Sequence, residues 1–260
     1  MGNKHITKTI DRIINILNYI IGNGYDSTSK KTEVELIKRV LGQSSPKVLI
    51  DVGGNIGMYT DQLLNNFQNV EVHIFEPSLT NINILSNKFS LNKNVTVNPV
   101  GLSNVNETVK LYSNEAGSGL GSLTKRHLEH FNINFDQSET IKVIKFIDYY
   151  NTNFKGQTID LFKIDVEGHE MDVLEGCEEV IDNIKCIQFE FGGCNIDTKT
   201  YFQNFWYFLK KRNFDVYRIS PIGLISIDKY SEQLEYFRTT NFICVNRNIS
   251  RSSQLQPIKV

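Results

Sequence analysis

A glycine-rich turn constrains the fold of this chain more than any other stretch. Positions 47–57 read K-V-L-I-D-V-G-G-N-I-G, a short apolar run of strand type followed by glycines. From Met58 onward the apolar residues recur at helical spacing. A buried strand, a tight turn and a helix, in this order, predict an α/β sheet whose ligand binds at the turn, where glycine lets the backbone approach it closely.

The turn differs from a dinucleotide-binding fingerprint. That fingerprint, G-x-G-x-x-G, would need a glycine where Asn55 stands. Asp51 ends the strand, and a carboxylate there would repel a pyrophosphate. The same carboxylate would attract the sulfonium and ammonium groups of S-adenosylmethionine, by roughly 1–4 kcal/mol at partly exposed range. A Walker-type lysine motif is absent, which argues against ATP.

A second apolar run places another acid near this turn. Positions 70–77 read V-E-V-H-I-F-E-P, so the strand ends in Glu76, 19 positions after Gly57. An acid about 20 residues beyond the glycine turn is placed to accept hydrogen bonds from ribose hydroxyls. Asp51 and Glu76 could each be merely the polar end of a strand. Together with the glycine turn, they predict a nucleoside cofactor.

Composition limits the class and the compartment. The formal net charge of −1 gives no electrostatic argument for nucleic acid as a main partner. We find no secretory signal and no apolar run long enough to span a bilayer, and we expect a cytoplasmic protein. The four cysteines lack C-x-x-C spacing and are expected to be core residues in a reducing compartment. They are Cys177, Cys186, Cys194 and Cys244.

We expect an N-terminal helical appendage (1–45), a core domain (46–247) and a polar tail (248–260). In the appendage, isoleucines and leucines at helical spacing predict an amphipathic helix that ends near Gly22 and Gly24, and a second helix over 27–41. The first helix is too apolar to lie bare. It therefore predicts packing on this domain or on a second copy. We expect a homodimer that forms through this helix or through the aromatic-rich helix expected over 200–212.

The core domain alternates strands and helices. Counting the two strands above, the pattern predicts an α/β fold with a seven-stranded, mostly parallel sheet and helices on both faces. Two further strands outside the alternation are expected to form an edge hairpin, over 107–112 and 139–147. The other expected strands are 95–100, 158–166, 184–191, 214–219 and 241–245, with a hairpin over 222–227. The expected helices are 78–91, 167–181 and 200–212, and 114–123 is expected to be a flexible loop near the site.

The densest group of ionisable residues follows the strand at 158–166. Positions 163–170 read K-I-D-V-E-G-H-E, and Asp165 ends the strand on the sheet edge where a ligand would bind. Glu167 and His169 crowd the turn that follows. Glu190, on the next strand, is placed to point the same way.

Five stretches in this order resemble the FkbM-type methyltransferases: D-V-G-G-N-I-G, H-I-F-E-P, N-P-V-G-L-S, K-I-D-V-E-G-H-E-x-x-V-L-E-G and Q-F-E. The resemblance covers about 47–245. It implies a Rossmann-like class I fold, a methyltransferase domain, and S-adenosylmethionine-dependent O-methylation of sugars, glycans or related polar natural products. Gly54 and His169 stand where the family often has alanine, so no special role for His169 is inherited.

The resemblance also implies which residues hold the cofactor and its product S-adenosylhomocysteine. Asp51, Gly53, Asn55 and Gly57 would hold the methionine part, and Glu76 the ribose. The full expected set is Asp51, Gly53, Gly54, Asn55, Gly57, Tyr59, Glu76, Pro77, Gly101 and Asp165.

Methyl transfer to a hydroxyl needs positioning and a base. The expected catalytic residues are His169, Asp165 and Glu167. We favour His169 as the base because an imidazole can act neutral at pH 7, with Asp165 orienting acceptor or cofactor. A divalent metal such as Mg²⁺, held by Asp165, Glu167 and Glu190, is a competing interpretation of the same cluster.

Two other functions stay open. A NAD-dependent oxidoreductase is disfavoured by Asn55 and Asp51, and a non-catalytic nucleoside-binding protein is disfavoured because the acids and glycines are intact. The acceptor is not named by any motif. Its contacts are expected from the loops over 114–135 and 219–236.

Overall fold

The computed structural model describes residues 2–25, 30–42, 46–249 and 258. The helices are α1 (Gly2–Ile20), α2 (Lys30–Leu41), α3 (Met58–Asn66), α4 (Leu79–Lys88), α5 (Phe146–Asn153), α6 (Glu170–Glu175), α7 (Cys194–Thr198) and α8 (Phe202–Lys211), with short 3-10 turns η1 (Glu129–Phe131), η2 (Glu178–Asn183) and η3 (Glu232–Leu234). The strands are β1 (Val48–Val52), β2 (Glu71–Phe75), β3 (Val95–Asn98), β4 (Gly101–Leu102), β5 (Glu107–Ser113), β6 (Gln137–Ile144), β7 (Ile159–Ile164), β8 (Ile184–Phe191), β9 (Phe214–Ser220), β10 (Gly223–Ser226) and β11 (Thr240–Asn246).

The main sheet has the order β10-β9-β11-β8-β7-β1-β2-β3. Strands β3, β2, β1, β7 and β8 pair in parallel, and β11 runs antiparallel to both of its neighbours, β8 and β9. The α/β class and the mostly parallel sheet are confirmed, but the count of seven strands was wrong. The sheet has eight, because β10, expected only as half of a hairpin, pairs with β9 and extends the edge.

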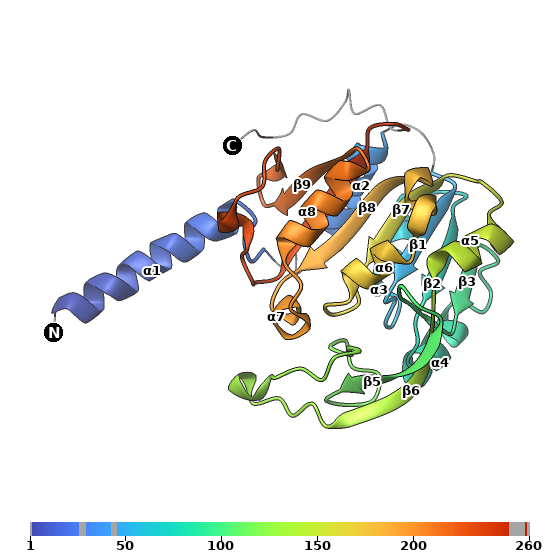
Figure 1. Cartoon of the computed structure of the whole chain (residues 1–260), viewed down its shortest axis with the longest axis horizontal. Helices are drawn as coiled ribbons and strands as arrows, with labels where there is room; N and C mark the ends of the chain where they lie inside the picture. The colour runs from blue at the N-terminus through green and yellow to red at the C-terminus, as the bar shows by residue number, and fades with distance from the viewer. Residues whose placement is uncertain (1, 26–29, 43–45, 250–257, 259–260) are drawn as a thin grey trace.

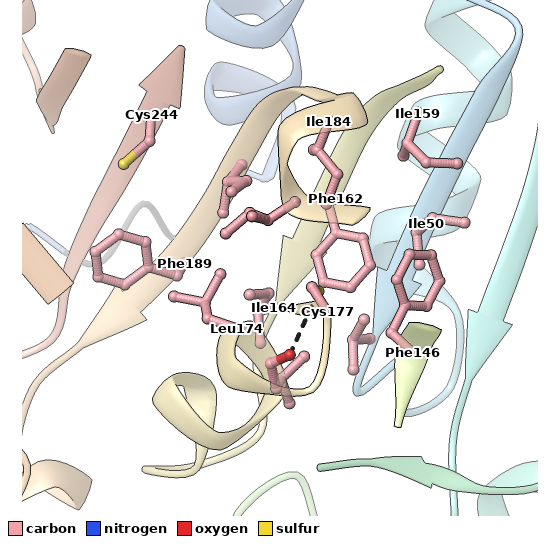
Figure 2. Packing of buried hydrophobic residues seen from close by; sticks show 14 of the residues in the cluster. Ile50, Phe146, Ile159, Phe162, Ile164, Leu174, Cys177, Ile184, Phe189 and Cys244 are labelled. Carbon is pink, nitrogen blue, oxygen red and sulfur yellow. Dashed lines mark hydrogen bonds between the residues drawn. The ribbon is translucent and has the colours of Figure 1, made fainter. Parts of the chain in front are cut away.

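The sheet is covered on both faces, as Figure 1 shows. One cluster of buried side chains joins the sheet to α5, α6 and α8, and the other joins it to α2, α3 and α4. Strand β1 serves both, since Ile50 lies in the first cluster and its neighbour Leu49 in the second, as the alternation of a strand requires. Figure 2 shows the first cluster, in which the Phe162 ring lies beside the Phe146 ring, with 4.7 Å between the ring centroids, and Ile50 lies close to Phe146. Strands buried on both faces explain the continuous apolar runs of the sequence.

The two strands outside the alternation form a separate sheet rather than an edge hairpin of the main one. Strand β6 pairs antiparallel with β5 and parallel with β4. The expected strand over 139–147 ends at Ile144, and α5 begins at Phe146. Phe146 and Ile147 continue the apolar pattern of β6 but are buried against the main sheet as helical residues.

Two helices differ from expectation. The helix expected over 167–181 is split into α6 and η2 around Gly176, where a Cβ would lie 2.0 Å from the backbone oxygen of Ser103. The aromatic-rich helix α8 is a core element, with Phe202, Phe205 and Leu209 fully buried. Helix α7 was not expected.

The N-terminal segment has two different parts. Helix α2 belongs to the body of the molecule, with Val34 and Ile37 fully buried in the cluster of α3. Helix α1 projects away from the body (Figure 1), and Ile13 and Leu17 keep 52% and 57% of their surface exposed. The start of the second expected helix, at 27–29, and most of the tail lie outside the described residues.

All four cysteines are unpaired and buried, as expected of core residues. Burial raises the pKa of the Cys177, Cys186 and Cys244 thiols. In the described part of the chain, no helix has both the length and the apolar character that crossing a membrane requires.

Candidate active site

A cavity of about 520 Å³ lies where β1, β2, β7 and β8 end. The main sheet supplies one wall, and β5, β6 and the loop between them supply the facing one. Such a position, at the carboxyl ends of parallel strands, is where open α/β sheets bind ligands. The structure places every expected site residue but one in its lining: Asp51, Gly53, Gly54, Asn55, Tyr59, Glu76, Pro77, Gly101, Asp165, Glu167, His169 and Glu190.

The turn after β1 is as tight as the sequence indicates. Gly53 has φ of 79°, and a Cβ there would lie 1.8 Å from the backbone oxygen of Asp165. The amides of Gly53 and Gly54 donate to the backbone oxygen of Phe75 at 2.9 and 3.2 Å. These glycines therefore let β1, β2 and β7 end together, which brings their terminal side chains into one cavity.

Gly57 is the exception among the expected residues. It does not line the cavity. With φ of 76°, it lies against α4, where a Cβ would come within 2.7 Å of the Phe89 ring and 2.9 Å of Leu85. Its position is explained by helix packing.

Glu76 is buried at the end of β2 and ordered by three donors. It accepts hydrogen bonds from the Asn55 amide at 2.8 Å, the Ser78 amide at 2.9 Å and the Asn81 side chain at 3.5 Å. Burial raises the pKa of this carboxyl to about 7, although the three donors oppose the shift. With this pKa, the Glu76 carboxyl is about half-ionised near neutral pH. A ligand that donates hydrogen bonds to it would increase its ionised fraction.

Two buried polar atoms beside Glu76 have no partner among the described residues. They are the Oγ of Ser78, at the first position before α4, and the Oδ1 of Asn81. Both residues line the cavity and are at most 3% exposed. Buried polar atoms are normally hydrogen-bonded, so this corner suits a ligand that carries hydroxyl groups. The sequence indicated Ser78 only as a helix cap, and its side chain makes no capping bond.

A buried lysine joins the acids at the centre of the sheet. Lys163 is the register partner of Asp51 on the neighbouring strand, and its Nζ lies 2.9 Å from Asp165 Oδ2. Asp51, itself 2% exposed, accepts a hydrogen bond from Thr60 Oγ1 at 2.6 Å. Lys163 belongs to the motif at positions 163–170, but no role for it was predicted from the sequence.

Glu167 is held in an ion pair that the sequence did not reveal. Its Oε2 lies 2.5 Å from Nη1 of Arg126, a guanidinium 9% exposed that also lies 3.5 Å from Asp197. Burial and the neighbouring Asp165 raise the pKa of Glu167 to about 8, against the opposing effect of Arg126. Arg126 lies about 40 residues away in a loop without a motif, so only the fold brings it here.

Both ring nitrogens of His169 are engaged. Nδ1 lies 2.7 Å from Asp172 Oδ2 and Nε2 lies 3.0 Å from Thr124 Oγ1. An ionised carboxylate only accepts, so Asp172 assigns the proton of a neutral ring to Nδ1 and leaves the Nε2 lone pair facing the Thr124 hydroxyl. A carboxylate, an imidazole and a hydroxyl in this order resemble the arrangement that activates a hydroxyl for proton transfer. Neither contact of the His169 ring, with Thr124 or with Asp172, was predicted from the sequence.

The remaining acids differ in their environment. Glu190 lines the cavity, and burial together with Asp165 and Glu167 raises its pKa well above the usual value. Glu170 instead accepts from the amides of Val166 and Gly168 and shapes the turn. Asp165, Glu167 and Glu190 share the cavity, but the described residues contain no group of three or more ligands arranged to hold a metal ion.

The glycine-rich loop after β5 closes the cavity from the other side. Gly117 packs on α4, where a Cβ would lie 2.8 Å from Asn81 Oδ1, and Gly119 would place a Cβ 3.2 Å from Asn55 Nδ2. Ser122 Oγ donates to the backbone oxygen of Glu167 at 2.8 Å. The loop therefore spans the cavity from the β1 turn to the turn after β7, and its position near the site is as expected.

The sheet order, the antiparallel β11 and a cavity built on a glycine turn and two strand-end acids define a Rossmann-like class I methyltransferase. The model of the methyltransferase FkbM domain matches residues 51–216, more than half of the chain. The chain therefore belongs to the FkbM methyltransferase family.

Individual relatives are distant. Methyltransferase 1 of Beauveria bassiana (strain ARSEF 2860) is 23% identical over 187 residues, which are 62% of this chain and 75% of that protein. The crystal structure of methyltransferase FkbM from Methylobacillus flagellatus KT is 17% identical with a TM-score of 0.45, and the match covers 76% of this chain but only 43% of that one. The O-methyltransferase of Bacillus cereus, solved in complex with SAH, is 11% identical with a TM-score of 0.46, over 90% of this chain and 87% of that one.

Proposed function

We propose that the protein is an S-adenosylmethionine-dependent O-methyltransferase that acts on a hydroxyl of a sugar, a glycan or a related polar natural product. The observation that carries the cofactor assignment is the corner at Glu76. A half-ionised carboxylate and two unpartnered buried oxygens, on Ser78 and Asn81, are what a ribose with two hydroxyl donors would satisfy. The family membership supports the transfer of a methyl group.

The charge of the cavity supports the same proposal. Acids outnumber the fixed cations in the lining: Asp51, Glu76, Glu139, Asp165, Glu167 and Glu190 against Arg126 and Lys163. The raised pKa values of Glu76, Glu167 and Glu190 reduce this excess near neutral pH, where it rests mainly on Asp51, Glu139 and Asp165. Both cations are already paired with carboxylates. A cationic methyl donor is therefore favoured over a pyrophosphate. An uncharged polyhydroxyl acceptor fits better than a nucleic acid, whose phosphates would meet the acids.

The acceptor hydroxyl must lose its proton as the methyl group arrives, and we assign this proton to His169. The bound cofactor would supply an electrophilic methyl group. His169 lines the cavity, and Asp172 orients its ring so that Nε2 is the basic atom. Thr124, which is not among the lining residues, stands 3.0 Å from that atom, so its hydroxyl must either relay the proton or turn away from Nε2. Glu167 is less suited as a base because Arg126 holds it in an ion pair.

Calorimetry with S-adenosylhomocysteine, NAD and no ligand would test the cofactor assignment. We expect the protein to bind S-adenosylhomocysteine and not NAD. Binding of NAD alone would favour the oxidoreductase instead, and binding of neither ligand would indicate a protein without a nucleoside cofactor. Sugar-nucleotide and glycan extracts would then be screened for incorporation of labelled methyl groups from S-adenosylmethionine. Labelling that survives mild base would exclude a methyl ester, and release of the label as methyl iodide by hydriodic acid would distinguish a methyl ether from a C-methyl group.

Cofactor affinity should depend on pH through Glu76. The free carboxyl has a pKa of about 7, and its ionised form accepts hydrogen bonds from ribose hydroxyls more strongly than its protonated form. Binding therefore releases protons at pH 6, and the affinity for S-adenosylhomocysteine should be weaker at pH 6 than at pH 8, by up to about tenfold. Calorimetry in two buffers of different ionisation enthalpy measures both effects. The Glu76→Gln variant should bind more weakly and show a flat profile; a wild-type profile that is equally flat would contradict the placement of the ribose.

We propose that α1 mediates a homodimer. Its apolar residues Ile6, Ile10, Ile13, Leu17 and Ile20 alternate at spacings of four and three, the repeat of a two-helix coiled coil. All five are exposed in the single chain.

Sedimentation at micromolar concentration should give a dimer, and Ile13→Lys with Leu17→Lys should give a monomer of unchanged thermal stability. The matched control is a pair of lysines at Asp11 and Asn18, which lie off the apolar stripe. A wild-type monomer would rule the dimer out.

A further inference from the structure

Helix α2 lies outside the residues that match the family model, yet hydrogen bonds join one of its acids to the wall of the cavity. Glu33 is 5% exposed, and its Oε2 accepts a hydrogen bond from Nε2 of Gln188 at 2.8 Å. The Oε1 of the same Gln188 accepts from the Tyr59 hydroxyl at 2.6 Å. A buried hydrogen-bonded chain therefore runs from α2, past β8, to a tyrosine in the cavity wall.

The chain ends on the central ammonium group. Nζ of Lys163 lies 5.4 Å from the centre of the Tyr59 ring and 2.9 Å from Asp165 Oδ2. Burial alone would lower the pKa of Lys163, but Asp165, Glu33 and Asp51 together raise it above its usual value. Lys163 thus stays charged, and Glu33 is one of the three carboxylates that favour its charged form.

We propose that Glu33 is a positioning residue of the cofactor site that balances the charge of Lys163, an inference that rests on the proposed function. Asp165 contacts the buried ammonium of Lys163, and Asp51 is its register partner on β1. Glu33 is linked to the same site through Gln188 and Tyr59, so three carboxylates act on one ammonium. Without Glu33, Lys163 would be neutralised by Asp51 and Asp165 alone, and these two would attract a cationic ligand less. The helical segment before the matched domain would then be part of the binding machinery.

A structural role for Glu33 and an electrostatic one differ in a measurable way. Loss of packing would weaken S-adenosylmethionine and S-adenosylhomocysteine equally, because the two share every group except the methyl. Loss of charge would weaken S-adenosylmethionine more, since only this ligand carries the sulfonium. The ratio of the two dissociation constants therefore isolates the charge.

The experiment compares Glu33→Gln with the matched control Glu35→Gln, an exposed acid on the same helix. Glutamine keeps the volume and an oxygen for Gln188 but removes the charge. Calorimetry should show that Glu33→Gln weakens S-adenosylmethionine about fivefold more than S-adenosylhomocysteine, whereas Glu35→Gln leaves both unchanged. An unchanged ratio would overturn the inference, as would an equal shift in the control.

A second variant protects the test against poor folding. Glu33→Asp keeps the charge but is too short to maintain the bond to Gln188, so it should keep the wild-type ratio even if both affinities fall. A changed ratio in Glu33→Asp with an unchanged one in Glu33→Gln would assign the effect to the hydrogen bond and overturn the inference. If the wild-type protein binds neither ligand, the proposed function fails, which is a different result from an unchanged ratio.

Discussion

Replacing Gly53 with alanine is expected to reduce the affinity for S-adenosylhomocysteine by about 100-fold or more, equivalent to roughly 2.7 kcal/mol. The added Cβ would lie 1.8 Å from the backbone oxygen of Asp165, and the positive φ of 79° is itself unfavourable to alanine. The turn after β1 would have to separate from the end of β7. Asp51 and Asp165 would then no longer face the same ligand.

The matched control is Gly156→Ala. Gly156 has φ of 92°, but no atom lies within 4 Å of the position of its Cβ. It therefore carries the backbone strain without the collision, and should lose some stability and no affinity. Calorimetry and thermal unfolding of both variants separate the two effects. Binding by Gly53→Ala within threefold of wild type would show that the ligand does not depend on this turn.

Replacing His169 with alanine should lower kcat by about 10²–10⁴-fold, the usual contribution of a positioned general base. The affinity for S-adenosylhomocysteine should change little, because the base acts on the acceptor. The pH profile of kcat/KM, measured with an acceptor from the methylation screen, should lose one ionisation in the variant. EDTA should have no effect on the wild-type rate.

The control for His169 is His127→Ala, since the His127 side chain is 85% exposed and lies outside the cavity. It should keep the wild-type rate and profile. If His169→Ala is fully active and EDTA inactivates the wild type, the role moves to a metal held by Asp165, Glu167 and Glu190. Activity in the variant without sensitivity to EDTA would point to Glu190 as the base.

The central strands were predictable because each is buried on both faces. Strands β1, β7 and β8 are fully or almost fully buried. Their sequences are therefore mostly apolar, with a few polar residues such as Lys163 and Gln188, and each strand is followed by an acid or a glycine. The approach of Asp51, Glu76 and Asp165 followed from this, since carboxyl ends of parallel strands meet at one edge. The positions of these three acids could therefore be predicted without knowing any contact between residues far apart in the sequence.

The elements outside the central strands were harder to predict, because long-range contacts decide their structure. Apolar residues continue from β6 past Lys145 into Phe146 and Ile147, and Lys145, which precedes α5, has no capping side chain. Only burial against the main sheet decides that these residues are helical. Likewise, Arg126 and Thr124 come from a loop without periodicity, and nothing local to them indicates that they approach Glu167 and His169.

The reactivity of the four buried thiols can be used to measure local unfolding of the core. A thiol reacts as the thiolate and only when a reagent can reach it, and burial both raises the pKa of these cysteines and excludes the reagent. Their modification therefore proceeds through transient opening of the elements around them. Cys194 lines the cavity, whereas Cys177 lies beneath α6 in the core. The rates at which the two thiols become labelled thus compare the opening of the ligand site with the opening of the fold that supports it.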